Sequence, residues 1–308
     1  MKDTKDKNKL VLPKNQSDKS KNYIRFDWAI KRLLRDKADF GAVNGLLSCI
    51  FEKQISIINV LESEGNQESE NSKFNRVDVL VEDETGEKII IEIQNNYQVD
   101  YYHRMLFGVS KVVTDFLKKG DNYDKIKKIF SVSIVYFELG QGTDYVYFGC
   151  TEFVGKHDKD KLELSKAQKR RYGVEKVGDI FPEYCLLRVE NFDEENVVKT
   201  EEKDFLDQWM YYLKTTDIPD DFDAHGLDEI REKQRVENLS EEEKQAYYRH
   251  LEQVNYEEGV IEHNRLEGII EGEKLKAIEI AKSLKESNMS IELIIKHTKL
   301  TKEEIENL

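Results

Sequence analysis

The sequence predicts an α/β fold that continues into an α-helical C-terminal extension. Up to about residue 220, short runs rich in β-branched residues alternate with segments whose apolar residues recur at helical spacing. From residue 227 to 286 the chain is rich in Glu, Lys and Gln with sparse apolar residues, which is typical of long exposed helices. The first pattern indicates a sheet packed against helices, and the second indicates the extension.

The composition limits the class of protein. A chain of 308 residues, 39% of them hydrophobic, can build one good core and still carry polar, extended parts. No apolar run reaches the ~18 residues that a membrane helix needs, and the N-terminus has no apolar stretch of signal-peptide length. Cys49, Cys150 and Cys185 have no metal-type spacing and are an odd count for a disulfide framework. We therefore expect a soluble protein of a reducing cytoplasm without a membrane partner.

The net charge of −14 argues against a protein that coats nucleic acid over its whole surface. It leaves a nuclease possible, because only the cleft of such an enzyme must be electropositive. Basic residues gather in residues 1–21 and again in residues 166–171. The alternative for each charged run is an ordinary solvated surface.

The first third of the chain predicts these elements in order. Residues 1–21 are polar and lack periodicity, so we expect a disordered basic arm. Residues 23–54 carry apolar residues at helical spacing that is broken near Gly41 and Gly45, which predicts two helices. A strand is predicted over 55–61, and a polar loop follows it.

The next elements include the hairpin on which the functional argument depends. Two β-branched runs, 76–81 and 88–94, are separated by the turn-like residues 83–87, which predicts a β-hairpin. A strong helix candidate follows at 100–119. Further strands are predicted over 130–137, 145–150 and 185–189, and further helices over 160–172 and 205–213.

The C-terminal part is predicted to be helical throughout. Long helices between residues 227 and 286 are candidates for self-association into a homo-oligomer. A helix over 291–297 is followed by a capping box at Thr301–Glu304 that opens another helix. This pair resembles a helix-turn-helix, and a helical hairpin used for packing or oligomerisation is an equal alternative. The predicted domains are the arm 1–21, an α/β domain 22–220, a helical region 221–286 and a helical hairpin 287–308.

The hairpin brings acidic residues together. Because strand side chains alternate faces, Asp78 and Leu80 share one face, and Ile90, Glu92 and Gln94 share the corresponding face of the second strand. A turn centred on Thr85 pairs Glu82 with Lys88, Leu80 with Ile90 and Asp78 with Glu92. Directly opposed side chains have Cβ atoms ~5 Å apart. The prediction is a pair of carboxylates at one end of a hydrophobic sheet, with Gln94 beside them.

Two opposed carboxylates repel each other on a sheet. A bound Mg²⁺ or Mn²⁺ would remove the conflict, since these cations prefer carboxylate, carbonyl and water oxygens. Such an ion lowers the pKa of a bound water and screens a phosphate that the water attacks. Gln94 can hydrogen-bond a water or a phosphate oxygen without adding charge. The alternative is that Asp78 and Glu92 lie on a solvated sheet face and have no function.

The helix predicted at 100–119 strengthens the case for a phosphodiester substrate. Its apolar residues should pack on the sheet; they are Tyr101, Met105, Val109, Val112 and Phe116. Arg104, Lys111 and Lys118 recur every seven residues and form one cationic stripe. Cations beside a carboxylate cluster suit a nucleic-acid backbone, and an ordinary solvated helix face is the alternative.

Several segments, taken in order, resemble the Rpn family of recombination-promoting nucleases, also called PD-(D/E)XK nuclease family transposases. The resemblance begins with Asp27 and Lys31 on the first helix and continues through Asp78, Glu92 and Gln94 and the Tyr-rich helix that carries Arg104. It extends from about residue 23 to the end of the chain. Later segments that carry it are 162–165, 179–184, 207–214, 224–227 and 289–305.

The resemblance implies a PD-(D/E)XK restriction-endonuclease-like core, a mixed central sheet flanked by helices, and Mg²⁺-dependent cleavage of DNA. Carried over by position, Asp78 and Glu92 would be metal ligands, and Gln94 would occupy the lysine position of the superfamily. Asp27 matches an early acidic position near the metal. Arg104 matches the arginine of the helix after the motif and, with Lys111, would contact DNA phosphates.

These observations lead to three hypotheses. The first is a metal-dependent DNA endonuclease with Asp78, Glu92 and Gln94 as catalytic residues, linked to recombination or mobile elements by the resemblance. The second is a catalytically weak DNA-binding or oligomeric assembly protein on the same fold. It rests on Gln94 in place of lysine and on the C-terminal helices. The third is an α/β protein whose polar sheet face is merely solvated.

Overall fold

The computed structural model describes residues 23–35, 40–62, 79–117, 120–195 and 204–308, with main chain only for 31–35 and 62. The predicted arm 1–21 lies outside these ranges. The chain divides into two compact units, one ending at Gln245 and the other running from Ala246 to Leu308.

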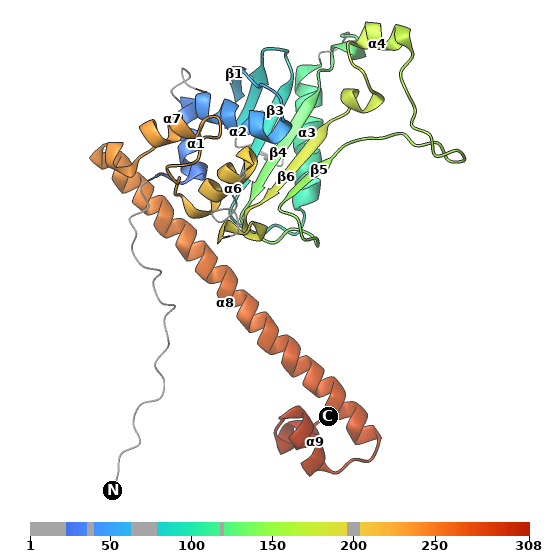
Figure 1. Ribbon diagram of the computed structural model, residues 1–308. Coiled ribbons are helices and arrows are strands. Elements are labelled where there is room, and N and C mark those ends of the chain that lie inside the picture. The colour runs from blue at the N-terminus through green and yellow to red at the C-terminus, as the bar shows by residue number, and fades with distance from the viewer. Residues whose placement is uncertain (1–22, 36–39, 63–78, 118–119, 196–203) are drawn as a thin grey trace. The chain divides into compact units, whose positions relative to one another are not determined.

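The described strands of the first unit form a mixed six-stranded sheet with the order β1-β2-β3-β4-β6-β5 (Figure 1). β3, β4 and β6 are parallel to one another, whereas β1 with β2, β2 with β3 and β5 with β6 are antiparallel. The mixed sheet predicted from the sequence is confirmed. The strands are β1 (Ile57–Glu62), β2 (Val79–Asp83), β3 (Lys88–Gln94), β4 (Ile129–Val135), β5 (Val146–Gly149) and β6 (Glu183–Arg188).

The β2–β3 hairpin has the predicted register over its described residues. Leu80 pairs with Ile90 and Glu82 pairs with Lys88. The turn is held by Asp83, whose carboxylate accepts hydrogen bonds from the main-chain N–H groups of Thr85 and Glu87 at 3.0 and 2.9 Å. The third predicted pair, that of residue 78 with Glu92, lies outside the described residues.

Helices cover both faces of the sheet (Figure 1). On one face, α1 (Phe26–Arg35), α2 (Gly41–Phe51) and α6 (Phe205–Thr215) share the main core with the inward residues of the strands. On the other face, α3 (Tyr101–Phe116) packs Val109 and Val112 against Leu80, Ile90 and Ile129. Burial of both faces explains why the central strands are apolar almost without interruption.

The strands therefore divide their side chains between two cores. In β3, the side chains of Ile89, Ile91 and Ile93 belong to the main core, while Ile90 faces α3. Glu92 alternates onto the same side as Ile90. This alternation places a carboxylate on the α3 side of the sheet.

One predicted helix is shorter than expected. Helix α4 (Lys166–Tyr172) begins only after Ser165, whereas the prediction ran from 160 to 172. The hydroxyl of Ser165 accepts a hydrogen bond from the main chain of Gln168, and the Gln168 side chain accepts one from the Ser165 N–H. This capping box ends the preceding extended segment, in which Lys161 is bridged to Val154.

The remaining elements of the first unit are short. Helix α7 (Leu227–Lys233) packs against α2. The 3-10 turns are η1 (Tyr123–Lys125), η2 (Val177–Ile180), η3 (Val189–Asn191) and η4 (Val236–Asn238).

The second unit consists of most of α8 (Glu241–Glu286) with α9 (Ile291–Thr298) and α10 (Lys302–Glu306). Both short helices pack on the C-terminal end of α8 through Ala281, Ile294, Leu300 and Ile305. The predicted capping box of Thr301 with Glu304 is present. None of the helices described in either unit combines the length and the apolar character that crossing a bilayer requires.

The close approach of α2 to the main chain of residue 225 generates a stability prediction. A Cβ atom at Gly45, inside α2, would lie 2.0 Å from the carbonyl oxygen of His225. We expect Gly45→Ala to lower the free energy of unfolding by at least about 1–3 kcal/mol, because the backbone must shift to admit the methyl group. Chemical denaturation measures the change.

Gly41→Ala is the matched control in the same helix. Its Cβ would meet only the side chain of Glu229, whose flexible end can move away. We expect this variant to unfold close to the wild type. Equal stabilities of the Gly41 and Gly45 variants would contradict the packing described for α2.

Candidate functional site

The candidate site lies at the end of β3, on the side of the sheet that α3 covers. Glu92 is 2% exposed and pairs with Ser133 of β4, and Gln94 ends the strand two residues later. Of the other predicted site residues, Asp27 is buried near the start of α1, and Arg104 and Lys111 lie on α3. Asp78 lies outside the described residues.

The carboxylate of Glu92 is flanked by two side chains from the first turn of α3. The Tyr101 hydroxyl lies 3.5 Å from one carboxylate oxygen, and Nε of Arg104 lies 3.6 Å from the other. Both distances are longer than an ordinary hydrogen bond between such groups. Arg104 also donates to the side-chain oxygen of Gln98 at 3.2 Å. The guanidinium therefore offsets the buried charge without holding it in a tight bidentate pair.

This arrangement follows from how α3 packs. The ring of Tyr101 is fully buried and Met105, one turn later, is nearly so, which anchors the start of the helix on the sheet. Arg104 stands between these two anchors in sequence and is left half-buried at the edge of the contact. The burial of Tyr101 and Met105, which lie on either side of Arg104 in the sequence, thus sets the position of Arg104 near Glu92.

A second polar cluster holds the residue that follows the strand. Asp27 accepts hydrogen bonds from the main chain of Trp28 at 2.9 Å and from the Asn95 side chain at 3.0 Å. Nε of Arg25 lies 3.3 Å from a carboxylate oxygen of Asp27. A terminal nitrogen of the same guanidinium donates to the side-chain oxygen of Asn95 at 3.0 Å. These three side chains form a polar network that connects the start of α1 with Asn95, which follows β3 and lies three residues after Glu92.

Arg25 and Asn95 were not identified from the sequence. The signal that was available is the run of polar residues Gln94, Asn95 and Asn96 directly after an apolar strand. Asp27, which the sequence did identify, is engaged by three donors, so its carboxylate positions the strand end. Asp27 and Glu92 are thereby placed at the same end of β3.

Tyr136 extends this cluster on the neighbouring strand end. The Arg25 guanidinium lies 5.1 Å from the centre of its ring, and the Tyr136 hydroxyl donates to the carbonyl of Leu213 at 3.1 Å. Burial, and then the nearby carboxylate of Asp27, raise the pKa of Tyr136 above its ordinary value. The phenol therefore stays protonated at neutral pH and acts as a hydrogen-bond donor.

The predicted cationic stripe is seen only in part. Arg104 turns toward Glu92, whereas Lys111, two turns further along α3, is exposed. Lys118 lies outside the described residues. Phe116 was expected to pack on the sheet, and this was wrong. Its side chain is 47% exposed at the last position of α3, where the Lys88 ammonium lies 4.9 Å from the ring centre.

The donor set tests whether a divalent cation fits. Among the residues that the structure describes, no three His, Cys, Asp or Glu side chains are grouped closely enough to hold a metal ion. Glu92 offers a buried carboxylate and Gln94 an amide oxygen, which are the hard oxygen donors that Mg²⁺ and Mn²⁺ prefer. Mg²⁺ sites in enzymes that act on phosphates commonly use one or two protein carboxylates. The described donors therefore fit such an ion in kind, and a second carboxylate would complete the set.

Comparison with known proteins adds independent information. Residues 24–172 match the sequence model of the family described as PD-(D/E)XK nuclease family transposase. A comparison with curated proteins found no match, and a comparison with solved structures found none either. The matched residues include α1, the β2–β3 hairpin and α3, and thus every part of the candidate site. Residues 24–172 of this chain are therefore similar to the PD-(D/E)XK nuclease family transposases.

Proposed function

We propose that the protein is a metal-dependent endonuclease that hydrolyses DNA phosphodiester bonds, with Asp78 and Glu92 as the ligands of Mg²⁺ or Mn²⁺. The observation that carries this proposal is the buried carboxylate of Glu92 on the α3 side of β3. The hairpin register, in which Val79 pairs with Ile91, would bring residue 78 opposite Glu92 if it continued by one pair. The family match supports a nuclease.

The cation, when bound, would lower the pKa of a water molecule and screen the charge of the attacked phosphate. Glu92 would hold it from a buried position, which keeps competing water away from the carboxylate. Gln94 lies on the same side of β3 and would orient a water or a phosphate oxygen through its amide. It cannot stabilise developing negative charge as a lysine would, so we propose modest catalytic power.

The cations of α3 would act on the nucleic-acid backbone. Arg104, whose guanidinium already lies beside Glu92, would turn toward a phosphate that enters the site. Lys111 is exposed two turns away and would contact a phosphate further along the strand. Asp27, with Arg25 and Asn95, would hold the end of β3 in place near the metal, which is a positioning role.

The substrate and the biological setting rest on the family. Its description joins nuclease and transposase, from which we propose DNA as the substrate and a link to recombination or mobile elements. We propose the bacterial cytoplasm as the place of action, since chromosomal DNA is accessible there.

Plasmid nicking by the purified full chain tests the proposal. We expect cleavage with Mg²⁺ or Mn²⁺ and none in a chelator. Asp78→Asn and Glu92→Gln should each lower the rate by about a hundredfold or more, because a ligand of the catalytic metal is lost. Circular dichroism checks that each variant is folded.

Glu84→Gln is the matched control, since it removes a carboxylate from the exposed turn of the same hairpin. It should nick plasmid at the wild-type rate. Undiminished nicking by Asp78→Asn, or cleavage that persists in the chelator, would refute the proposed metal site.

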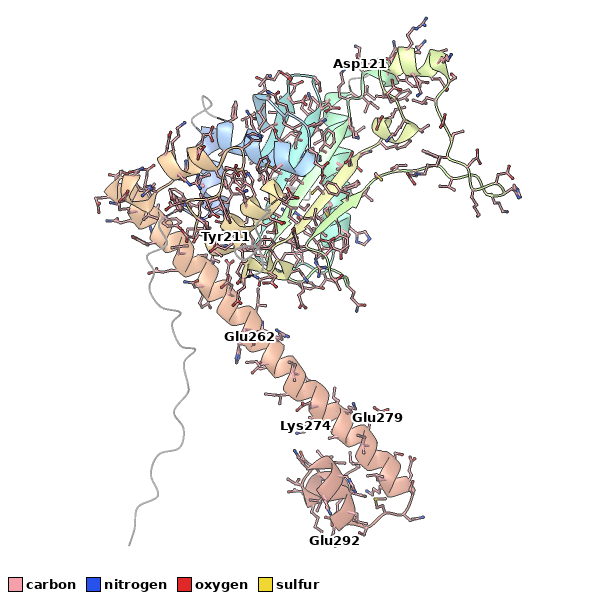
Figure 2. All side chains as sticks on the ribbon, viewed as in Figure 1. Asp121, Tyr211, Glu262, Lys274, Glu279 and Glu292 are labelled. Carbon is pink, nitrogen blue, oxygen red and sulfur yellow. The ribbon has the colours of Figure 1, made fainter. Side chains whose placement is uncertain are left out.

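The second candidate function is assembly through the C-terminal helices. The helix α8 exposes a series of large apolar side chains in the second unit: Val260, Ile261, Leu266, Ile269, Ile270 and Leu275. Charged residues such as Glu262, Lys274 and Glu279 also project from this helix (Figure 2). An exposed helix with both kinds of residue is typical of helices that pair with another copy. We propose that copies of the protein associate through α8 into a homo-oligomer. This assembly is compatible with an active nuclease and with a catalytically weak DNA-binding module.

Sedimentation velocity at micromolar concentration tests the assembly. We expect an oligomer for the wild type and a monomer for Leu266→Glu combined with Ile270→Glu, because these residues lie one turn apart on one face. Asn264→Glu adds a charge about 200° from Leu266, on the face that carries Val260 and Ile261. We expect this variant to keep the oligomer, which would restrict the contact to the face of Leu266 and Ile270. A monomeric wild type would exclude this role.

A further inference from the structure

A pocket of about 510 Å³ lies beside α3, on the same side of the sheet as Glu92. Its walls come from the first two turns of α3, from residues 139–141, from the edge strand β5 and from its neighbour β6. Leu139, Leu186 and Met105 are buried beneath it in one apolar cluster. The pocket is therefore a depression with an apolar floor, next to the candidate site.

The upper walls of the pocket are aromatic. Tyr102, Tyr147 and Tyr184 line it, and the first two are among the exposed large apolar side chains of the protein. The loop before β5 fixes one of them, since the Tyr147 hydroxyl accepts a hydrogen bond from the main-chain N–H of Asp144 at 3.0 Å. Exposed aromatic faces around a cavity suit a planar apolar group such as a nucleobase.

Of the described residues that line the pocket, Arg188 alone is charged. It is 3% exposed, and one terminal nitrogen donates to the carbonyls of Gly142 and Asp144 at 3.1 and 3.2 Å. Within the described part of the chain, its Nε has no hydrogen-bond partner and no carboxylate forms an ion pair with the guanidinium. A buried cation without an anion is costly, so the pocket is electrostatically suited to an anionic group.

Sheet register relates this arginine to the candidate site. Gln94 pairs with Val135 of β4, and Val135 pairs with Arg188 of β6. The main chains at Gln94 and Arg188 are therefore two strand spacings apart, about 10 Å. A nucleic-acid strand that passes the end of β3 would reach the pocket within a few nucleotides.

We propose that this pocket receives one unstacked nucleotide of single-stranded DNA, with its base against the aromatic walls and its phosphate at Arg188. The combination of aromatic faces and an arginine is the one that single-strand binding uses. A base inside a duplex is stacked and paired, so it cannot enter a depression of this kind unless it is extruded. The inference deepens the proposed nuclease function and rests on it for the choice of DNA.

Binding in a chelator tests the pocket without any cleavage. The full chain is titrated into a fluorescently labelled single-stranded DNA oligonucleotide and anisotropy is recorded. We expect Tyr102→Ala and Tyr147→Ala each to weaken binding at least about fivefold, since the loss of one stacking partner has an effect of that size. Both residues are exposed, so the variants should fold.

Phe107→Ala is the matched control. Phe107 lies on α3 with 48% of its side chain exposed, close to the 53% of Tyr102, and it does not line the pocket. It should bind the oligonucleotide as the wild type does. A loss of affinity equal to that of Tyr102→Ala would show that removing any exposed aromatic side chain has this effect. That result would overturn the proposal.

Arg188→Gln provides a second readout. We expect the slope of log Kd against log salt concentration to fall by about 0.7, the value for one phosphate contact on a single strand. An unchanged slope, in a variant that circular dichroism shows to be folded, would contradict the proposed contact between Arg188 and a phosphate.

The outcomes separate this inference from the nuclease proposal. Pocket-dependent binding by a chain that never cleaves DNA would support the pocket and contradict the nuclease. Cleavage by the wild type, together with undiminished binding by Tyr102→Ala and Tyr147→Ala, would support the nuclease and overturn the pocket.

Discussion

The structure depends above all on the pairing register of β3, which is hydrogen-bonded on both sides and buried on both faces. The side chains of Ile89, Ile91 and Ile93 must enter the main core, and this leaves Ile90 and Glu92 on the α3 side. A slip by one residue would exchange the two sets and expel three isoleucines from the core. A carboxylate is therefore held in a buried position by the free energy of apolar burial around it.

The same register organises everything on the α3 side of the sheet. Glu92, Ser133 and Leu186 form one row across β3, β4 and β6, and Gln94, Val135 and Arg188 form the next. Helix α3 covers the first strands of these rows and brings Arg104 to Glu92. The pocket opens where α3 no longer covers the sheet. The proposed metal site and the proposed nucleotide pocket are thus two parts of one sheet surface.

Much of this arrangement could be predicted from local sequence. The turn residues around Thr85 and the alternation on either side predicted the described hairpin pairs, because both signals lie within a few residues of one another. The Arg25–Asp27–Asn95 network could not be predicted, since its members are 68 and 70 residues apart. Arg188 was also missed. In sequence it is a lone cation after Cys185-Leu186-Leu187, and only the pairing of β6 with β4 reveals where it lies.

The position of a bound cation tests most directly whether the buried carboxylate of Glu92 is a metal ligand. Crystals of the full chain soaked in Mn²⁺ should show an anomalous peak bounded by the carboxylates of Asp78 and Glu92, and Mn²⁺ should raise the melting temperature of the wild type, since an ion that binds only the folded state stabilises it. Both effects should be lost in Glu92→Gln. A saturating soak that gives no peak at Glu92, with an unchanged melting temperature, would contradict the claim that this buried carboxylate is a metal ligand.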